Sequence, residues 1–544
     1  MQNERKGMEM DFIDRAIQNG LHISGKTELD SQTWEEFEKK SAGKKVLLFG
    51  AGACADFYFM RYKEKAVLNG VIDNDCKKHG FYADDFISEA FYIKDRRIKI
   101  TGSSFLGQYH AGEAVVLISS TKFYKEISEQ LESLGILDYF VLLIMEANER
   151  KSKGWPYLES ADDSLKKTIF AEECCRRHPV EKKKVFFRAY GDYTDHGKYI
   201  TEALVKIRKD LDIVWALDDM TTEVPEGVRK VNKGNWKKFI YEMETAGMWV
   251  LDLAVPSYVV KREGQIYLQT KHWASITLKK FYLDASTFEE VPELVENWKR
   301  DGKMIDHVIT GSDFDEESCR RGFGFQGEVL PCGSPRSDAM FHEEENRKKV
   351  YGHYKIDGKI KTLLYAPTYR FDKKKGKSFH SAKEVELDFG QIKKALEERF
   401  LGEWNILLRL HPSVAQACKN MEKPDFVIDV SDYKDSQELA SAADIMISDF
   451  SSIMFEPAFV KKPVFLFATD IQDYIANEYD LLIKYEELPF AAAESNEELA
   501  WNIRNFNKEA YVEQVGQFLE GYGVHEDGHA SERVAEYISK TIGE

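Results

Sequence analysis

The chain has 544 residues, with 76 Lys and Arg against 93 Asp and Glu, so its formal net charge at pH 7 is −17. This length predicts about three or four domains, because a single domain usually has about 100–200 residues. The hydrophobic share of 43% and the charged share of 31% are typical of a soluble globular protein and exclude the disordered and fibrous classes. The acidic balance argues against nucleic-acid binding through bulk electrostatics.

The seven cysteines include no CxxC pair and do not indicate a disulfide framework. Residues 1–15 lack the apolar core of a signal peptide. The longest apolar run, Phe140 to Met145, is far shorter than the roughly 20 residues that span a bilayer. We therefore expect a cytoplasmic protein, and peripheral contact with the inner face of the cell membrane stays open.

The first half of the chain predicts one α/β unit between helical segments. Residues 1–43 have a polar, helical pattern. From Lys44 to residue 150, apolar strand patterns (46–50, 69–73, 115–120 and 140–145) alternate with helical ones, which indicates a Rossmann-like unit. Residues 151–182 are charged and helical in pattern, and we interpret them as a connector.

Two further α/β series follow. The first has short apolar strand patterns at 185–187, 213–217, 249–253 and 307–310, and the second has them at 362–368, 405–412, 426–430, 443–449 and 463–468. Strand–helix alternation of this kind predicts doubly wound parallel sheets. We expect two Rossmann-type domains, 183–335 and 336–544, that face each other across a cleft.

The N-terminal unit carries a glycine motif between its first strand and first helix. Gly50 and Gly52 follow the strand, Ala55 has the place of a third small residue, and Asp73 ends the second strand. A dinucleotide fingerprint requires this context, because the backbone must approach a pyrophosphate and a carboxylate must reach a ribose. Both a nucleotide loop and a structural or regulatory domain with a vestigial loop stay open.

Candidate site residues, most of them polar, follow four predicted strands in the second half. They are His272; Pro367 and Thr368; Arg409 and His411; and Ser451 and Ser452, with Glu456 in the helix that the serines open. Doubly wound sheets bind their ligands at the carboxyl ends of strands, so we expect these side chains to form one site. Serines at a helix N-terminus suit a phosphate, and Arg336, Arg409 and His411 add charge and hydrogen bonds. The pattern favours a nucleotide-diphosphate donor without a metal.

Six segments resemble a known family. QTKHWASITLKKF, GSPRSD, LLYAPTYR, LRLHP, ISDFSSIMFEPAF and DGHASERV, in this order, are similar to the motifs of the CDP-glycerol glycerophosphotransferases, the teichoic acid primase and polymerase family. The resemblance covers about residues 183–540. The N-terminal part instead resembles a small Rossmann-like domain found in sugar-modifying enzymes.

The resemblance implies a GT-B-like pair of domains that moves a polyol phosphate, most simply glycerol phosphate, from a CDP-polyol to an acceptor hydroxyl and releases CMP. It implies a role in a teichoic-acid-like or capsular polymer, a lipid-linked or oligosaccharide acceptor, and no metal or further cofactor. The positions carried over by motif are catalytic His272 and His411 and donor-binding Arg336, Pro367, Thr368, Arg409, Ser451, Ser452 and Glu456.

Two positions depart from the family pattern. The loop that usually has HGTPLK has Trp273 and Ala274 after His272, and the acid after the serines is Glu456 instead of Asp. We expect these changes to affect the choice of donor or acceptor more than the reaction class. Trp273 is expected to stack on a different acceptor or to narrow the cleft.

We expect His272 to act as general base, because an imidazole accepts a proton near neutral pH. Arg336 is expected to neutralise the leaving CMP and Glu456 to bind polyol hydroxyls, whereas Asp449 suits a helix-start role and a site role equally. Two alternatives stay open, a GT-B glycosyltransferase that uses a nucleotide sugar and an inactive scaffold or sensor of polymer assembly. The lysine runs at 182–184, 279–280 and 373–375 are most simply solvated.

Overall fold

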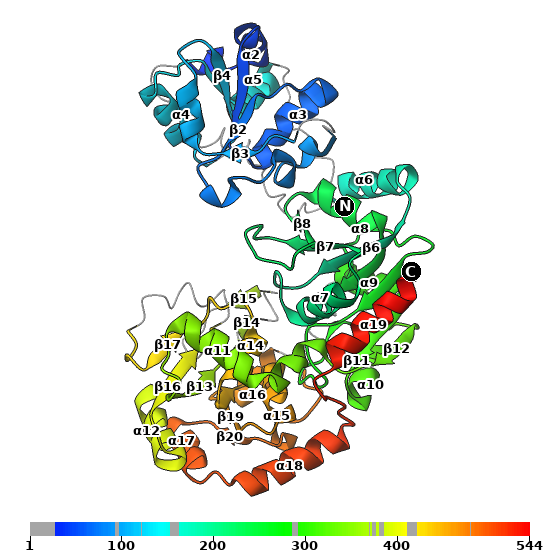
Figure 1. The fold of residues 1–544 in the computed structure, drawn as a ribbon, viewed down its shortest axis with the longest axis vertical. Coiled ribbons are helices and arrows are strands. Elements are labelled where there is room, and N and C mark those ends of the chain that lie inside the picture. The colour runs from blue at the N-terminus through cyan, green and yellow to red at the C-terminus, as the bar shows by residue number, and fades with distance from the viewer. Residues whose placement is uncertain are drawn as a thin grey trace, which may run out of the picture.

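The computed structural model describes residues 28–92, 97–120, 122–152, 163–285, 292–368, 370–372, 377–379, 386–410, 422–478 and 480–543. Three parallel sheets follow one another along the chain. Figure 1 shows them as three bodies along the long axis, with the N-terminal unit at one end, the middle unit next to it and the C-terminal unit at the other end.

The N-terminal unit has a five-stranded parallel sheet in the order β3-β2-β1-β4-β5. Its strands are β1 (Lys45–Phe49), β2 (Gly70–Ile72), β3 (Ile100–Thr101), β4 (Ala114–Ile118) and β5 (Tyr139–Val141), and its helices are α2 (Trp34–Ser41), α3 (Asp56–Tyr62), α4 (Tyr124–Ser133) and α5 (Leu142–Ser152). β4 is buried along its whole length, as expected for a parallel strand covered on both faces.

The middle unit has a seven-stranded parallel sheet in the order β12-β11-β10-β9-β6-β7-β8. Its strands are β6 (Glu181–Arg188), β7 (Asp212–Leu217), β8 (Arg229–Asn232), β9 (Ala246–Leu251), β10 (Ile266–Gln269), β11 (His307–Thr310) and β12 (Glu328–Pro331), and its helices are α6 (Asp163–Arg177), α7 (Asp195–Ile207), α8 (Trp236–Thr245), α9 (Pro292–Met304) and α10 (Asp313–Phe323). Two buried clusters, one on each face of the sheet, form its core.

The C-terminal unit has a six-stranded parallel sheet in the order β17-β16-β13-β18-β19-β20, and a separate antiparallel pair, β14 (Arg370–Asp372) and β15 (Lys377–Phe379). The strands of the sheet are β13 (Lys361–Tyr365), β16 (Trp404–Leu408), β17 (Val427–Asp429), β18 (Ile445–Ser448), β19 (Val464–Phe467) and β20 (Ala491–Ala493). The helices that follow η10 (Pro335–Phe341) are α11 (Glu343–Tyr354), α12 (Phe389–Phe400), α14 (Ser436–Ala442), α15 (Phe455–Phe459), α16 (Ile471–Asn477), α17 (Asn496–Arg504) and α18 (Lys508–Gly521).

The last helix returns to the middle unit. After α18 the chain passes Glu526 and enters α19 (Ala530–Ile542), which lies against the middle sheet in Figure 1. Val534, Ala535 and Ile538 are part of the buried cluster on that face of the sheet. This packing joins the two ends of the second half of the chain.

The N-terminal unit contacts the first turn of α8. Asn235 donates to the carbonyl oxygen of Asp84 at 2.7 Å, and Lys238 pairs with Asp85 at 2.6 Å. Lys237 pairs with Glu89 in the same contact. Several of these charges are at least half-buried, so the contact fixes the two units side by side.

One strand predicted from the sequence is partly a helix. The apolar run at 140–145 was expected to be a strand, but β5 ends at Val141 and α5 begins at Leu142. Leu142 to Met145 are fully buried, and periodicity alone cannot distinguish a buried helix from a buried strand over so short a run. Of the predicted N-terminal helical segment, residues 1–27 lie outside the described residues, and α2 accounts for half of residues 28–43.

Candidate active site at the junction of the middle and C-terminal units

Arg336 is the centre of a buried ion-pair network between the two units. Its Nη1 donates to Asp195 Oδ2 at 2.7 Å and to the carbonyl oxygen of His272 at 2.9 Å, and its Nη2 donates to Glu456 Oε1 at 2.7 Å. The two carboxylates raise the pKa of the guanidinium further, although its burial acts in the opposite sense. Arg336, at the start of η10, therefore joins α7, the loop after β10 and α15.

Asp195 was not singled out from the sequence. It is the first residue of α7 and has a left-handed backbone with φ of 59°, which is uncommon outside glycine. An aspartate at a helix start is ordinarily a cap, but here the side chain reaches across to Arg336 instead. The only sequence signal was its place shortly after a buried strand.

His272 follows β10, as predicted, and the residue is partly accessible to solvent. The ring stacks against Tyr190 with 6.1 Å between centroids and 22° between planes. Surrounding protein atoms desolvate the imidazole and lower its pKa, while Asp195 acts in the opposite sense. A lowered pKa leaves the ring neutral at pH 7, which is the form that accepts a proton.

The loop that carries His272 is held from below by Lys271. This lysine is fully buried, has a φ of 54°, and pairs with the buried Asp315 at 3.0 Å. Its Nζ also donates to the carbonyl oxygens of Trp273 and Ala274 at 3.0 and 2.9 Å. These contacts fix the loop on the middle sheet.

Trp273 does not face the site, contrary to the expectation that it stacks on an acceptor or narrows the cleft. Its side chain is buried and packs on Phe281 and Phe323, with ring centroids 4.2 and 6.0 Å away. The indole N–H donates to Asp315 at 3.2 Å. Lys271, two residues earlier, has a left-handed backbone conformation, and the Trp273 side chain after this turn points into the core.

Ser452 and the His272 loop are in direct contact. Ser452 Oγ accepts a hydrogen bond from the backbone N–H of Leu278 at 3.1 Å and lies 3.2 Å from Thr277 Oγ1. Ser451 is half-buried beside it, with no capping hydrogen bond from its side chain. The serine pair precedes a 3₁₀ turn and the short helix α15. The hydrogen bond from Leu278 to Ser452 connects the middle and C-terminal units.

Glu456 is buried, and one of its two oxygens is unused. Oε1 accepts from Arg336, whereas Oε2 has no hydrogen-bond partner among the described residues. Burial raises the pKa of this carboxyl, and Arg336 opposes the shift. The contact of Glu456 with a donor hydroxyl stays a prediction.

The strand ends of the C-terminal sheet are organised by Asp449. Its Oδ1 accepts from the backbone N–H of Thr368 at 2.8 Å and from that of Phe450 at 2.6 Å. This side chain is buried and connects the ends of β13 and β18. Pro367 precedes Thr368 at the same edge. Asp449 therefore holds the two strand ends together, and its choice between a helix-start role and a site role stays a prediction.

Arg409 lies at the end of β16, and its Nη1 donates to the carbonyl oxygen of Tyr433 at 2.6 Å. Burial lowers the pKa of its guanidinium, while Asp435 acts in the opposite sense. His411, predicted as a second catalytic histidine, lies outside the described residues. The structure therefore brings His272, Arg336, Glu456 and Ser452 together. Arg409 follows β16, which belongs to the same C-terminal sheet as β18, the strand that precedes Ser452.

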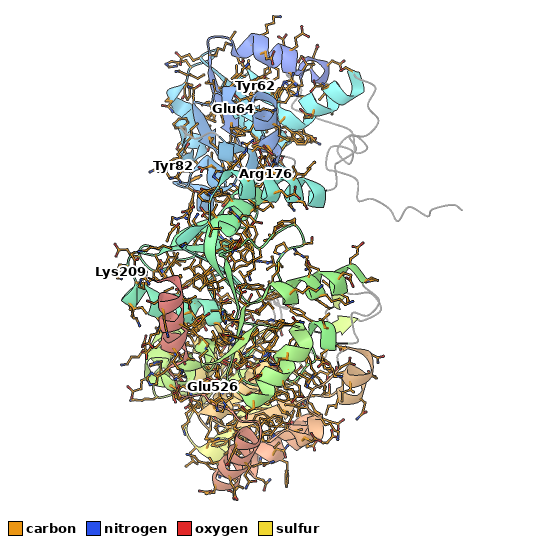
Figure 2. The ribbon with its side chains drawn as sticks, turned by 90° about the vertical axis from the view of Figure 1, so that its right-hand side faces the viewer. Tyr62, Glu64, Tyr82, Arg176, Lys209 and Glu526 are labelled. Carbon is orange, nitrogen blue, oxygen red and sulfur yellow. The ribbon has the colours of Figure 1, made fainter. Side chains whose placement is uncertain are left out.

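Two of the recognised segments serve to anchor α19. Asp338, in GSPRSD, accepts from the backbone N–H groups of Ala530 and Ser531 at 3.0 and 2.7 Å. Both residues belong to DGHASERV. Glu526, labelled in Figure 2, accepts from Ser334 N at 3.2 Å and contacts Ser275 Oγ. Burial raises the pKa of Glu526 to about 7.

Asp252 is a further buried acid, not predicted from the sequence although it directly follows the buried strand β9. Its Oδ2 accepts from Tyr190 N at 2.9 Å, and its Oδ1 has no hydrogen-bond partner among the described residues. Burial and the neighbouring Asp195 raise its pKa to about 8, and Arg188 and Lys233 oppose the shift. This carboxyl therefore carries a proton for much of the time at neutral pH.

In the N-terminal unit, the glycine loop after β1 is hydrogen-bonded to Asp73. Asp73 Oδ2 accepts from Ala51 N at 2.8 Å and pairs with Lys78 at 3.0 Å. Gly50 has a φ of 111°, and Gly52 is extended. The three residues predicted to form a nucleotide loop therefore lie together at the ends of β1 and β2.

The family described as CDP-Glycerol:Poly(glycerophosphate) glycerophosphotransferase matches residues 171–540, about two thirds of the chain. The chain therefore belongs to this family.

Named relatives agree with this assignment. A teichoic acid poly(glycerol phosphate) polymerase of Staphylococcus epidermidis is 29% identical over 380 residues, 67% of this chain and 52% of the relative. A teichoic acid glycerol-phosphate transferase of Staphylococcus aureus is 26% identical over 66% of this chain and 93% of its own length. A teichoic acid ribitol-phosphate primase of Bacillus spizizenii is 28% identical over 56% of this chain and 77% of its own. The chain spans about half the length of the first of these relatives.

The fold agrees as well. A solved structure of the wall teichoic acid polymerase TagF, a variant soaked with CDPG, is similar with a TM-score of 0.61 and 27% identity. The similarity covers 70% of this chain and 94% of that one. The chain therefore has a TagF-like, GT-B-like α/β fold built on parallel sheets.

Proposed function

We propose that this chain transfers a polyol phosphate, most simply glycerol phosphate, from a CDP-polyol to an acceptor hydroxyl and releases CMP in the synthesis of a teichoic-acid-like polymer. The family match over residues 171–540 carries the proposal. The names of the relatives specify glycerol-phosphate and ribitol-phosphate transfer, so either polyol is compatible with it.

In the proposed reaction, the acceptor oxygen forms a bond to the distal phosphorus while the bond from that phosphorus to the CMP oxygen breaks. His272 takes the proton of the attacking hydroxyl, which its lowered pKa supports because the neutral ring prevails near pH 7. CMP leaves as an anion. Positioning of two anionic partners and stabilisation of the transferring phosphoryl group supply the rate enhancement.

The contacts of Arg336 support a role different from the one expected from the sequence. Its guanidinium is engaged with Asp195, Glu456 and the backbone of His272. We therefore assign Arg336 to positioning the general base, and leave the diphosphate to Ser451, Arg409 and His411. The free oxygen of Glu456 is assigned to a donor hydroxyl.

We also propose a division into a Rossmann-like accessory domain (44–150), a connector (151–182), an acceptor-side domain (183–335) and a CDP-donor domain (336–529). The separate sheets support this division. The last segment, 530–542, is assigned to the acceptor-side domain because α19 packs on its sheet.

The acceptor is proposed to be a polyol-phosphate chain or its primer, carried on lipid or on an oligosaccharide, with peripheral contact at the membrane. Among the described residues, no helix is long and apolar enough to cross a bilayer. The basic run at 182–184 does not provide a free cationic patch, because Lys184 is buried and pairs with Glu181 and Glu242. Sedimentation with anionic and neutral vesicles tests this contact.

The function is tested with a donor panel of CDP-glycerol, CDP-ribitol and UDP-glucose, each with a polyol-phosphate acceptor. Release of CMP from a CDP-polyol is the expected result and names the donor. Release of UDP would assign the chain to the sugar transferases. Absence of turnover together with absence of CDP-glycerol binding would indicate an inactive scaffold.

A further inference from the structure

The N-terminal unit contains a cavity of about 580 Å³ that the transfer reaction does not use. It lies at the carboxyl ends of β1, β2 and β4, where Gly52, Asp73, Ser119 and Phe123 contribute to its lining. Its volume is within the range of about 300–1,000 Å³ that is usual for small-molecule sites.

The cavity is at the position where this sheet topology places a ligand. From β1 the chain builds β2 and β3 on one side of the sheet, then crosses to build β4 and β5 on the other. The order therefore reverses between β1 and β4, and open α/β sheets bind ligands in the crevice outside that point.

The loop after β1 leaves its backbone open to the cavity. A Cβ atom at Gly52 would meet no atom within 4 Å, whereas one at Gly50 would lie 2.9 Å from Ser119 Oγ. Gly50 thus makes the tight turn, and Gly52 leaves space for a ligand to approach the chain. Two hydrogen bonds hold the loop in this conformation: Ala51 N donates to Asp73, and Lys78 donates to the carbonyl oxygen of Ala51.

An aromatic ring and a cation stand at the edge of the cavity. Phe123 is 52% exposed although it is a large apolar side chain. Lys122 Nζ lies 5.1 Å from the centre of its ring. Lys78 pairs with Asp73 in the lining. Two further carboxylates, Asp75 and Glu126, also line the cavity, so the phosphate of a ligand is expected on the side of Lys122 and the Gly52 backbone.

We propose that this cavity is a mononucleotide site, in which the base stacks on Phe123 and the phosphate faces the backbone of Gly52 and the amine of Lys122. An exposed aromatic face suits any base, because each base has a π-face to stack. A single nucleotide is favoured over a dinucleotide, since β1 to β3 form one mononucleotide-binding half and only two strands follow on the other side.

The test uses the full chain and isothermal titration with ADP, GDP, UDP and CDP. Gly52→Glu fills the cavity without backbone strain, because the extended conformation of Gly52 accommodates any residue. Gly107→Glu is the matched control, since a side chain there also meets no atom within 4 Å and Gly107 does not line the cavity. Phe123→Ala removes the stacking surface at a solvent-exposed position.

We expect at least one nucleotide to bind the wild type and the Gly107→Glu variant equally. Gly52→Glu should lose this binding, and Phe123→Ala should weaken it at least 5-fold. CDP should occupy two sites in the wild type and one in Gly52→Glu if it also enters the donor site. Binding that is unchanged in Gly52→Glu, or no binding of any of the four nucleotides beyond the donor site, would overturn the proposal. The result does not depend on the transfer activity.

Discussion

Replacing Arg336 with methionine removes the cation shared by Asp195 and Glu456 while keeping a side chain of similar length. Both partners are at 2.7 Å, and the side chain of Glu456 is 1% exposed. The substitution therefore leaves two carboxylates at the junction of the units without their counter-charge.

The magnitude follows from the burial of these groups. At an effective dielectric constant of about 20, each pair at this distance has an attraction of about 6 kcal/mol. In the wild type the cost of taking the charges out of water offsets most of that attraction. When one partner is removed the cost remains, and breaking a buried pair costs about 3–5 kcal/mol. We expect the unfolding free energy to fall by this amount at pH 8.

The loss depends on pH. Burial already raises the pKa of Glu456, and without Arg336 that pKa rises further. A carboxyl whose pKa is higher in the folded than in the unfolded state loses stability as pH rises through the interval between the two values. The deficit should therefore be smaller at pH 5, where Glu456 takes up a proton.

Urea unfolding of the wild type, Arg336→Met and the double variant Arg336→Met/Glu456→Gln at pH 5 and pH 8 measures these effects. The double variant should regain part of the loss at pH 8. Arg320→Met is the control, because the pair of Arg320 with Glu316 is exposed and such pairs contribute about 0–1 kcal/mol. If Arg336→Met is no more destabilising than this control, or is more destabilising at pH 5 than at pH 8, Arg336 does not stabilise the fold through these two buried pairs.

Three further predictions concern single side chains. His272→Ala should lower kcat at least ~100-fold with the fold retained. The acid limb of the wild-type kcat/KM profile should lie below pH 6.5, because the pKa of His272 is lowered. Wild-type turnover by the variant would exclude His272 as the general base. Asp338→Ala removes the cap of α19 and should cost about 1–2 kcal/mol in urea unfolding, and an unchanged midpoint would contradict this role. The pKa of Asp252 is raised to about 8, so the unfolding free energy of the wild type should fall as pH rises from 5 to 8. Asp252→Asn should reduce this dependence on pH. An equal dependence in both proteins would show that the pKa of Asp252 is not raised by burial.

Much of the fold could be predicted because parallel strands covered on both faces appear as continuous apolar runs. β13 and β16 are of this kind, and both were located from the sequence. The boundary within 140–145 could not be predicted, since strand β5 and the start of α5 are equally apolar and equally buried.

The site was predictable where polar residues follow strands and unpredictable where the partner is distant in sequence. His272 and Thr368 are at such strand ends. Asp195 and Arg336 are separated by 141 residues, and nothing local to Asp195 indicates that its side chain leaves its own helix. Only the packing of α7 against η10 brings the two together.

The direction of a side chain in a loop was equally beyond local patterns. Trp273 adjoins the predicted base, so a place in the site was reasonable. The left-handed conformation of Lys271 and the buried pair with Asp315 instead turn the indole into the core. A charged residue fully buried under the loop therefore decides which neighbours of His272 face the substrate.

In the proposed reaction the acceptor hydroxyl attacks phosphorus and not a sugar carbon. Phosphorus-31 NMR of a reaction with CDP-glycerol and a polyol-phosphate acceptor, followed together with nucleotide analysis, tests it most directly. We predict a new phosphodiester signal that grows in equal amount with CMP and is absent in His272→Ala. Release of a nucleoside diphosphate without any new phosphodiester signal, from any donor that turns over, would contradict the account.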